Sequence, residues 1–455
     1  MRLTLKEIKN ICHVAGSELS DSVVIECIST DTRTISSGSL YVALQGHNFD
    51  GHQFIEDAFN KGAVACLVSK EIPEKYKNKC MQVADTLKSL GDIACAWRKK
   101  FSIPTIVITG SAGKTTTKEF VAAILAQKGV VCKTQGNFNN LIGLPLTLFG
   151  LNESHNFAVL EIGMNAFGEI DRLTEIATPT IALITNVGRA HLEGVGSLDG
   201  VAKAKGELFL KLEQTSTALV NLDDPNIKKM PTPATRVTYG FNDEATIQGE
   251  KPVFDDESML VSVRTPKWQH KFRLPFVGDY LAKNFLAAVS VAFLLDIEPE
   301  KIQIAMDHLD FFKHRGEKVV LKNDILLIDD CYNANPEAMS AAFEAFGKRF
   351  PNRRKIAILG DIFELGLESN KLHQEVGELA SKNNFDALFA VGERASFYVK
   401  GFTLTEKKEA YAFAEIADMS EKLNSFLKPG DALLVKGSRG ARMERVIEFL
   451  EKEEA

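Results

Sequence analysis

The sequence predicts an α/β protein built from about three domains, and two observations support this prediction. The chain has 455 residues, and a single domain usually holds about 100–200 residues. Through most of the chain, apolar strand-like runs alternate with helical stretches, which is typical of a parallel sheet covered by helices. Most of these runs end in Gly or Asp. Because ligands bind at the carboxyl ends of strands in open α/β sheets, we expect the binding sites there.

Composition and charge exclude several classes of protein. Hydrophobic residues make up 45% and charged residues 25% of the chain, as in a soluble globular enzyme. The net charge of −6 provides no basic surface for nucleic acid, and neither a long apolar run nor a signal-peptide core predicts a membrane anchor. The seven cysteines form no C-x-x-C pair, which argues against a disulfide framework and against a zinc site. We therefore expect a cytoplasmic protein.

Changes in composition along the chain predict two domain boundaries. The first 84 residues carry short strand-like runs separated by Gly and Asp turns, which predicts a small N-terminal α/β module. A helical segment then leads to Pro104, where a longer alternation of strands and helices begins. A charged stretch near residue 312 precedes a second such alternation. The predicted domains are therefore 1–84, 85–312 and 313–455.

The segment GSAGKTT at residues 110–116 predicts a phosphate-binding loop. It follows the β-branched run TIVIT and precedes an amphipathic helix, so free N–H groups and the helix dipole favour an anion there. The usual pattern is G-x-x-x-x-G-K-[ST], but Ile108 stands where its first glycine is expected. Lys114 can reach the β- and γ-phosphates, and Thr115 or Thr116 can bind Mg²⁺. The alternative is a structural turn between a strand and a helix.

The shortened loop resembles that of the Mur ligases and of their relatives, the folylpolyglutamate synthases, in which this length is normal. The resemblance covers nearly the whole chain and implies three α/β domains. These are an N-terminal UDP-binding module, a central P-loop ATPase-like parallel sheet with helices on both faces, and a C-terminal Rossmann-like domain. It also implies that ATP and two Mg²⁺ ions take part. The residues expected to contact ATP are Gly110, Ser111, Ala112, Gly113, Lys114, Thr115, Thr116, Asn284, Arg315, Asp330 and Lys436.

Three further residues match the family's metal-binding pattern. Glu161 ends the apolar run FAVLE, and His191 fits the pattern N-x-x-x-x-H-L-E. Lys205 stands at the spacing from His191 at which Mur ligases carry a lysine that becomes carbamylated. The resemblance implies that Thr115 holds the first Mg²⁺, and that Glu161, His191 and the carbamate of Lys205 hold the second. Unmodified, Lys205 would be an ordinary surface cation. The expected catalytic set is Lys114, Glu161, His191, Lys205 and Arg315.

Substrate-binding segments of the family are matched in all three domains. The segment from Ser29 to His52 resembles the UDP-binding pattern, and the segment QGNFNN matches one that lies beside the phosphates and the substrate in the family. The C-terminal segments DDCYNANP and GDIFELG place polar side chains after strands. Tyr280 and Leu281 replace the His and Asn that the family carries near adenine, so the adenine contact stays open. The expected substrate contacts are Ser29, Thr30, Asp31, Arg33, Gly46, Asp50, His52, Asn137, Asn139, Asn140, Asn333, Asn335 and Asp361.

The resemblance also implies a reaction. Mur ligases activate a carboxylate with ATP as an acyl phosphate, and an amine then displaces phosphate to form an amide. The C-terminal segments DDCYNANP, GDIFELG and KGSRGARME resemble the branch that joins D-alanyl-D-alanine to UDP-N-acetylmuramoyl-tripeptide in peptidoglycan precursor synthesis. We therefore expect these two substrates, a monomeric enzyme, and closure of the domains around the bound substrates.

Three alternative functions stay open at this point. The branch that adds the third peptide residue carries an Asp-Asn-Pro-Arg motif, which this sequence lacks. A folylpolyglutamate synthase shares the loop but lacks the UDP-binding module. A protein that only binds ATP does not need a second metal site. The sequence also leaves open whether the third residue of the tripeptide is diaminopimelate or lysine.

Overall fold

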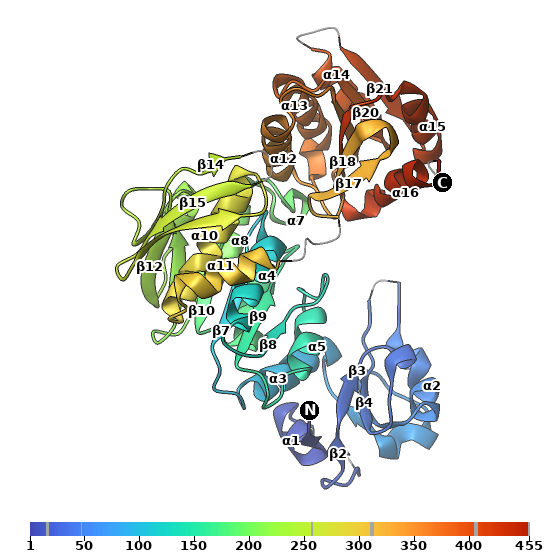
Figure 1. Ribbon diagram of the computed structural model, residues 1–455. Helices are drawn as coiled ribbons and strands as arrows, with labels where there is room; N and C mark the ends of the chain where they lie inside the picture. Colours follow the sequence, from blue (N-terminus) through green and yellow to red (C-terminus); the bar gives the residue numbers. More distant parts are fainter. Residues whose placement is uncertain (15–17, 47, 256–257, 310–313, 405–407, 454–455) are drawn as a thin grey trace.

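Three α/β bodies lie in a row along the molecule. The computed structural model describes residues 1–14, 18–46, 48–255, 258–309, 314–404 and 408–453. Figure 1 shows the N-terminal body in blue and the C-terminal body in orange and red at opposite ends of the central one. The predicted α/β architecture with three domains is confirmed. The second predicted boundary, at residue 312, lies outside the described residues.

The N-terminal body is built on a parallel sheet of four strands in the order β3-β4-β5-β6. Leu40 and Tyr41 are neighbours on a central strand and face opposite sides of the sheet, and both are buried, as expected for a sheet covered on both faces. Helices α1 (Leu5–Ile11) and α2 (Ile55–Asn60) belong to this body. Its strands are β1 (Leu3–Thr4), β2 (Val24–Ile25), β3 (Cys27–Ser29), β4 (Ser39–Val42), β5 (Ala63–Val68) and β6 (Cys80–Gln82).

Helix α3 (Thr86–Arg98) joins the first body to the second. Asp85 caps its N-terminus by accepting from the backbone N–H groups of Leu87 and Lys88. Its side chains then face the central body, where Trp97 Nε1 donates to Leu151 O at 3.2 Å. Gly91 allows close packing, since a Cβ atom there would lie 2.7 Å from Ile176 Cδ1. The helix therefore fixes the N-terminal body against the central one.

The central sheet has ten strands, and its parallel part contains the predicted phosphate-binding loop. The order is β14-β15-β13-β12-β11-β10-β7-β9-β8, with β16 paired to β15. All pairs from β8 to β13 are parallel, whereas β14, β15 and β16 add an antiparallel extension at one edge. The strands are β7 (Thr105–Thr109), β8 (Val131–Lys133), β9 (Phe157–Glu161), β10 (Ile181–Ile184), β11 (Thr217–Asn221), β12 (Thr235–Gly240), β13 (Ile247–Gly249), β14 (Val253–Phe254), β15 (Met259–Arg264) and β16 (Gln269–Leu274).

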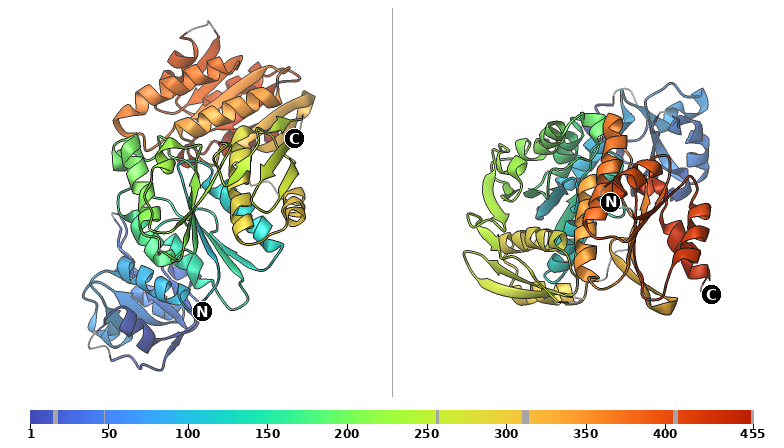
Figure 2. Two further views of the ribbon diagram at one scale, coloured as in Figure 1. Left: turned by 90° about the vertical axis from the view of Figure 1, so that its left-hand side faces the viewer. Right: turned by 90° about the horizontal axis from the view of Figure 1, so that it is seen from above.

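Helices cover both faces of this sheet, as the sequence predicts. Ile106 and Ile108 of β7 pack with side chains of α4 and α10, whereas Val107 between them packs with side chains of α6 and α8. The left view of Figure 2 shows green helices on one side of the sheet and cyan and yellow helices on the other. The helices are α4 (Lys114–Ala126), α5 (Gly143–Phe149), α6 (Glu169–Ala177), α7 (Leu192–Val195), α8 (Leu198–Leu210), α9 (Pro225–Lys228), α10 (Asp279–Leu294) and α11 (Pro299–Asp307).

The C-terminal body is a doubly covered sheet of six strands in the order β17-β18-β22-β19-β20-β21. Only β17 is antiparallel to its neighbour. None of the helices in the described ranges is both long and apolar enough to span a membrane. The elements are β17 (Glu317–Leu321), β18 (Ile325–Asp330), α12 (Pro336–Arg349), β19 (Lys355–Gly360), α13 (Ser369–Lys382), β20 (Ala387–Val391), α14 (Ala395–Phe402), β21 (Glu409–Phe413), α15 (Ile416–Phe426), β22 (Ala432–Lys436) and α16 (Glu444–Glu453).

Candidate active site

The predicted phosphate-binding loop connects β7 to α4 at the carboxyl edge of the central sheet. Gly113 has a φ of +79°, and a Cβ atom on it would lie 2.3 Å from Asn284 Oδ1. A Cβ atom on Gly110 would lie 1.9 Å from Thr185 Oγ1. Both positions therefore require glycine. The loop ends at the N-terminus of α4, where unpaired N–H groups favour an anion.

The segment that follows β10 holds this loop in place. Thr185 Oγ1 donates to Ala112 O at 2.6 Å. The side-chain amide of Asn186 makes two hydrogen bonds to the same residue. Its Oδ1 accepts from Ala112 N and its Nδ2 donates to Ala112 O, each at 2.9 Å. The hydroxyl of Ser111 accepts from Gly188 N at 2.8 Å and donates to Gly188 O at 3.0 Å. The loop is thus shaped by protein contacts alone, which favours a preformed anion site.

Lys114, the first residue of α4, bends back over the loop. Its Nζ donates to Gly110 O at 2.8 Å. Burial lowers the pKa of Lys114, and the nearby Arg315 lowers it further, while Glu161 acts in the opposite direction. A phosphate beside the ammonium would raise the pKa of Lys114 again, because an opposite charge favours the protonated lysine.

Replacement of Gly113 by alanine tests the shape of the loop. We expect Gly113→Ala to weaken ATP binding about tenfold or more, because backbone strain alone costs about 1–3 kcal/mol and about 1.4 kcal/mol corresponds to a factor of ten. Gly430→Ala is the matched control, since Gly430 has a φ of +84° with nothing within 4 Å of the added Cβ atom. Titration calorimetry with a non-hydrolysable ATP analogue measures the effect. Equal affinities of the two variants would contradict the proposed role of the loop.

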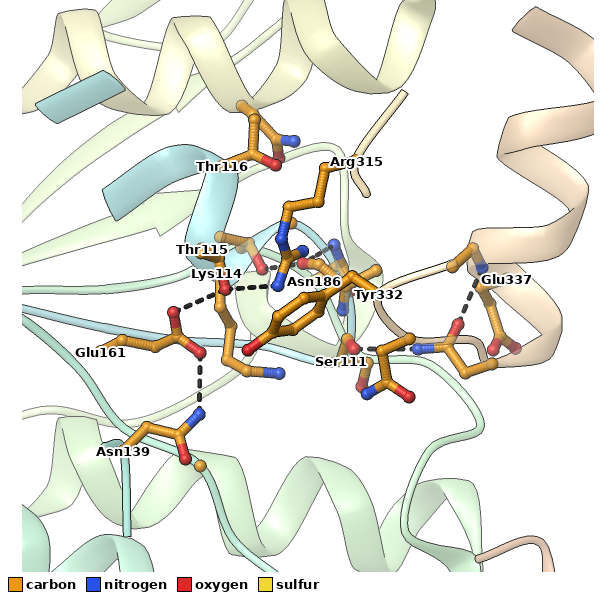
Figure 3. Close-up of a pocket in the computed structure, with 18 of the residues that line it drawn as sticks. Ser111, Lys114, Thr115, Thr116, Asn139, Glu161, Asn186, Arg315, Tyr332 and Glu337 are labelled. Carbon is orange, nitrogen blue, oxygen red and sulfur yellow. Dashed lines mark hydrogen bonds between the residues drawn. The ribbon is translucent and has the colours of Figure 1, made fainter. Parts of the chain in front are cut away.

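Thr115 and Glu161 bring two oxygen donors together next to the loop. Thr115 Oγ1 donates to Glu161 Oε2 at 2.7 Å, and Asn139 Nδ2 donates to Glu161 Oε1 at 2.8 Å. Figure 3 shows Glu161 between the other two, with a dashed line to each. Glu161 is only 2% exposed, and its carboxylate is oriented by both partners. A hydroxyl and a carboxylate are the hard oxygen ligands that Mg²⁺ prefers, so the chemistry of Thr115 suits the first predicted metal site and that of Glu161 suits the second.

Arg315 of the C-terminal body reaches the same place. Its Nη2 donates to Thr115 Oγ1 at 3.0 Å. The guanidinium carbon lies 3.8 Å from the ring centroid of Tyr332, which is the geometry of a cation–π contact. Figure 3 shows both side chains over the loop residues. The stacking orients a cation toward the position where the γ-phosphate of a bound nucleotide is expected.

Other polar side chains of the C-terminal body lie nearby. Asn335 Nδ2 donates to Ser111 O at 2.9 Å, and its Oδ1 accepts from Ala338 N, which caps α12. Lys436 Nζ lies 2.5 Å from Asp330 Oδ2 and donates to Asn333 O at 3.2 Å. Asn335, which follows β18, therefore contacts the loop of the central sheet, and Lys436 at the end of the neighbouring strand β22 holds the segment after β18.

A cavity of about 1290 Å³ lies between the central and C-terminal bodies. Its volume exceeds the range of about 300–1,000 Å³ that is usual for one small ligand, so there is room for more than one substrate. Tyr280 and Leu281 also line it. The predicted site residues that line this cavity are Ser111, Ala112, Gly113, Lys114, Thr115, Thr116, Asn137, Asn139, Asn140, Glu161, His191, Asn284, Arg315, Asp330, Asn333, Asn335 and Lys436.

Lys205 and Asp361 lie outside the lining of this cavity. Lys205 on α8 is 1% exposed. The alternative that Lys205 is an ordinary surface cation is therefore wrong. Burial, together with the charge of Lys114, holds the pKa of Lys205 well below its ordinary value. Asp361 accepts from the backbone N–H groups of Glu393 and Arg394 at 2.9 and 3.1 Å, so its carboxylate fastens the segment after β20.

The predicted UDP-binding residues form a separate cluster at the carboxyl ends of β3 and β4. Asp31 accepts from the guanidinium of Arg33, and Ser29 Oγ donates to Asp31 O. Asp50 accepts from Lys70 at 2.8 Å and lies 2.6 Å from His52 Nδ1. These two partners hold the pKa of Asp50 below its ordinary value. The cluster follows the rule that ligands bind beyond the carboxyl ends of parallel strands.

Two ion pairs and one histidine–carboxylate contact connect the central body to the C-terminal body beside the cavity. His191 Nδ1 lies 2.5 Å from Glu364 Oε2, and this contact lowers the pKa of Glu364. Arg189 Nε lies 3.0 Å from Glu337 Oε1, and Arg189 Nη1 lies 2.8 Å from Glu375 Oε2. These contacts link residues of the two bodies and therefore hold the bodies together beside the cavity.

Replacement of Arg189 by methionine removes both ion pairs and keeps most of the side-chain volume. Each partly exposed pair contributes about 0.2–1 kcal/mol, so we expect kcat/KM to fall about 2- to 30-fold at low salt. Added salt should lower the kcat/KM of the wild type and leave the kcat/KM of the variant nearly unchanged, because salt screens such pairs. Arg264→Met, whose nearest acidic partner Glu250 lies 3.9 Å away in the central body, is the control. A loss that is independent of salt would contradict the ion-pair role.

Sequence reasoning assigned no role to several residues that the structure brings to the site. Thr185 and Asn186 shape the loop, Tyr332 stacks on Arg315, and Arg189 joins the two bodies. Asn186 and Arg189 lie within the motif that identified His191, so their position in that motif could have indicated a role at the site. The partner of Tyr332 depends on how two bodies meet, which has no local sequence signal.

Comparisons with known proteins agree with the fold. The description "Mur ligase middle domain" matches residues 108–292, "Mur ligase, glutamate ligase domain" matches 314–439, and "Mur ligase family, catalytic domain" matches 24–98. The chain belongs to the Mur ligase family.

Within this family, the chain resembles one group of relatives in particular. It is 35% identical to the UDP-N-acetylmuramoyl-tripeptide–D-alanyl-D-alanine ligase of Synechocystis, over 99% of this chain and 98% of the relative. The solved structure of MurF from Acinetobacter baumannii matches with a TM-score of 0.90 and 30% identity, covering 99% of both chains. MurF ligase from Thermotoga maritima in complex with ADP matches with a TM-score of 0.83 and 28% identity, over 94% of this chain and 97% of that one.

Members of the two alternative enzyme branches are more distant. A solved UDP-N-acetylmuramoyl-L-alanyl-D-glutamate–2,6-diaminopimelate ligase is 16% identical, with a TM-score of 0.58. The folylpolyglutamate synthase of Mycobacterium tuberculosis is 13% identical, with a TM-score of 0.65. These similarities show the shared fold alone.

Proposed function

We propose that this chain is an ATP-dependent ligase that joins D-alanyl-D-alanine to the C-terminal carboxylate of UDP-N-acetylmuramoyl-tripeptide, in peptidoglycan precursor synthesis. The observation that carries the proposal is the cavity between two bodies, where the phosphate-binding loop, Glu161 and Arg315 converge. The substrates follow from the relatives named for this reaction, one of which is 35% identical over nearly the full length.

The reaction proceeds in two steps on this site. A carboxylate oxygen of the tripeptide attacks the γ-phosphorus of ATP, which gives an acyl phosphate and ADP. The amine of the dipeptide then attacks the acyl carbon, the C–O bond breaks, and phosphate leaves while the amine loses a proton. The loop N–H groups, Lys114 and Arg315 stabilise the charge on the transferred phosphoryl group. Enclosure between the two bodies keeps water from the acyl phosphate.

Magnesium is proposed at two positions. Thr115 would hold the first ion, and Glu161, His191 and a carbamate on Lys205 would hold the second. Bound Mg²⁺ would offset the repulsion between the phosphate oxygens and the carboxylate. The second set of metal ligands requires carbamylation of Lys205, because an ammonium group has no lone pair to donate to a metal ion. The lowered pKa of Lys205 supports it, since the uncharged amine is the form that combines with CO₂.

The substrate contacts are distributed over the three bodies. We propose that the cluster from Ser29 to His52 binds the UDP group, while Asn137, Asn139 and Asn140 face the tripeptide end. Asn333 and Asn335 are the candidates for the incoming dipeptide. In this proposal Asp361 acts indirectly, because its carboxylate is engaged by backbone N–H groups after β20. We further propose a monomeric, cytoplasmic enzyme.

A phosphate-release assay with a panel of amines tests this function. Phosphate should appear only when ATP, the UDP-muramoyl-tripeptide and D-alanyl-D-alanine are all present. Replacing the dipeptide by D-alanine, L-lysine or glutamate should abolish release. Release with a single amino acid would instead support the branch that adds the third residue or a folylpolyglutamate synthase. ATP binding without release under any condition would support a protein that only binds.

A further inference from the structure

A histidine, an aspartate and a cysteine meet beside the ATP site, where the C-terminal body begins, and the histidine also lines the cavity. One ligand atom from each of His314, Asp329 and Cys331 lies within 4.8 Å of the others. Asp329 Oδ2 lies 2.6 Å from His314 Nδ1, and Asp329 Oδ1 accepts from Cys331 N at 3.1 Å. The antiparallel pairing of β17 with β18 produces this arrangement, since Tyr332 N donates to His314 O across the hairpin.

The three side chains differ in burial in a way that suits a binding site. Cys331 is 0% and Asp329 3% exposed, whereas the side chain of His314 is 32% exposed. Two ligands are therefore shielded from water, and the third lines the cavity between the two bodies. Imidazole, thiolate and carboxylate are together the ligands that Zn²⁺ binds in proteins, whereas Mg²⁺ prefers oxygen ligands alone.

We propose that His314, Asp329 and Cys331 form a binding site for Zn²⁺ or a similar borderline-soft divalent cation, separate from the magnesium sites of the ligase reaction. Metal–ligand bonds of about 2.0–2.3 Å in tetrahedral geometry require the ligand atoms to lie roughly 3.3–3.7 Å apart. The three atoms already lie within 4.8 Å of one another. Shifts of about an ångström are therefore enough to seat the ion.

Binding of the cation releases one proton from the site. The Cys331 thiol releases its proton to solvent and binds as a thiolate. His314 uses the lone pair on Nδ1, and its proton resides on Nε2. The fourth position is open to water.

The position of the site connects it to the ligase site. His314 directly precedes Arg315, and Asp329 and Cys331 flank Asp330, which pairs with Lys436. An ion here would fix the start of β17 to the end of β18. The sequence argued against zinc because it has no C-x-x-C pair, but these ligands are brought together by strand pairing across 15 residues or more.

Cobalt substitution tests the site in the full-length protein under reducing conditions. Bound Co²⁺ should give a thiolate-to-metal charge-transfer absorption that saturates at about one ion per chain. Cys331→Ser should lose this absorption, and Zn²⁺ should abolish it in the wild type while excess Mg²⁺ does not. His314→Asn should weaken Co²⁺ binding at least tenfold. This variant should fold, because Asn tolerates the positive φ of 64° at position 314.

The controls are Cys132→Ser and His308→Asn, which remove a buried cysteine and an exposed histidine of the central body. Both should keep the absorption and the affinity of the wild type. The proposal is overturned if the wild type gives no thiolate absorption, or if His314→Asn binds Co²⁺ as tightly as His308→Asn. The assay needs neither ATP nor dipeptide, so its outcome is independent of the proposed ligase activity.

Discussion

Replacing Lys114 with methionine is expected to lower the rate of phosphate release about 100- to 1,000-fold, because removal of one preorganised group that stabilises transition-state charge has an effect of this size. Lys114 is the only lysine within the loop segment GSAGKTT. Its ammonium lies over the loop, 2.8 Å from Gly110 O, where the phosphates of ATP are expected. Methionine keeps the length of the side chain and removes the charge.

Two measurements separate this effect from a loss of folding. Lys99→Met is the matched control, because Lys99 is an exposed lysine at the end of α3, and it should keep wild-type kcat. Thermal unfolding should show that Lys114→Met is at least as stable as the wild type, since a partly buried charge is removed. A Lys114→Met enzyme with more than a tenth of wild-type kcat would contradict the role of this lysine.

Replacing Lys205 with alanine is expected to lower kcat at least about 100-fold, because the carbamate that completes the second metal set is lost. Lys205→Glu should retain more activity than Lys205→Ala, since it supplies a carboxylate in place of the carbamate. Lys203→Ala is the control on the same helix, because Lys203 is exposed and lies over the ring of Phe167. It should keep wild-type activity.

The pH dependence of the modification follows from the pKa of Lys205. Only the uncharged amine combines with CO₂, and a proton competes for the same nitrogen. Because burial and Lys114 hold this pKa well below its ordinary value, the carbamate should persist near neutral pH and be lost as the pH falls through the lowered pKa. Carbon-13 NMR with labelled bicarbonate should show one carbamate signal in the wild type and none in Lys205→Ala. A fully active wild type without that signal would contradict the proposal.

The parts of the site that depend on contiguous residues could be predicted from the sequence. The loop at 110–116 was found because a β-branched strand, two glycines and a lysine follow one another directly. Glu161 was found because it ends an apolar strand, and parallel strands bring their carboxyl ends to one edge. The structure places Glu161 2.7 Å from Thr115 by this rule.

Other features depend on packing between distant segments and had no local signal. Arg315 meets Thr115 across 200 residues, and only the resemblance to a family indicated its role. The antiparallel strands β15 and β16 were missed because alternate residues on each are exposed or half-buried, so they lack the continuous apolar run that marks the parallel strands. Asp361 directly follows a strand, much as Glu161 ends one, but its carboxylate accepts from the N–H groups after β20 and does not line the cavity. The position of a residue at a strand end therefore does not decide which way its side chain points.

Transfer of oxygen from the tripeptide to phosphate tests the central claim most directly. The UDP-muramoyl-tripeptide would be prepared with both oxygens of its terminal carboxylate labelled with oxygen-18, and incubated with unlabelled ATP and D-alanyl-D-alanine. If the carboxylate is activated as an acyl phosphate, each phosphate released should carry one labelled oxygen, and the new amide should keep the other. Mass spectrometry measures both products. Unlabelled phosphate alongside the amide product, or release without any amide, would contradict the account.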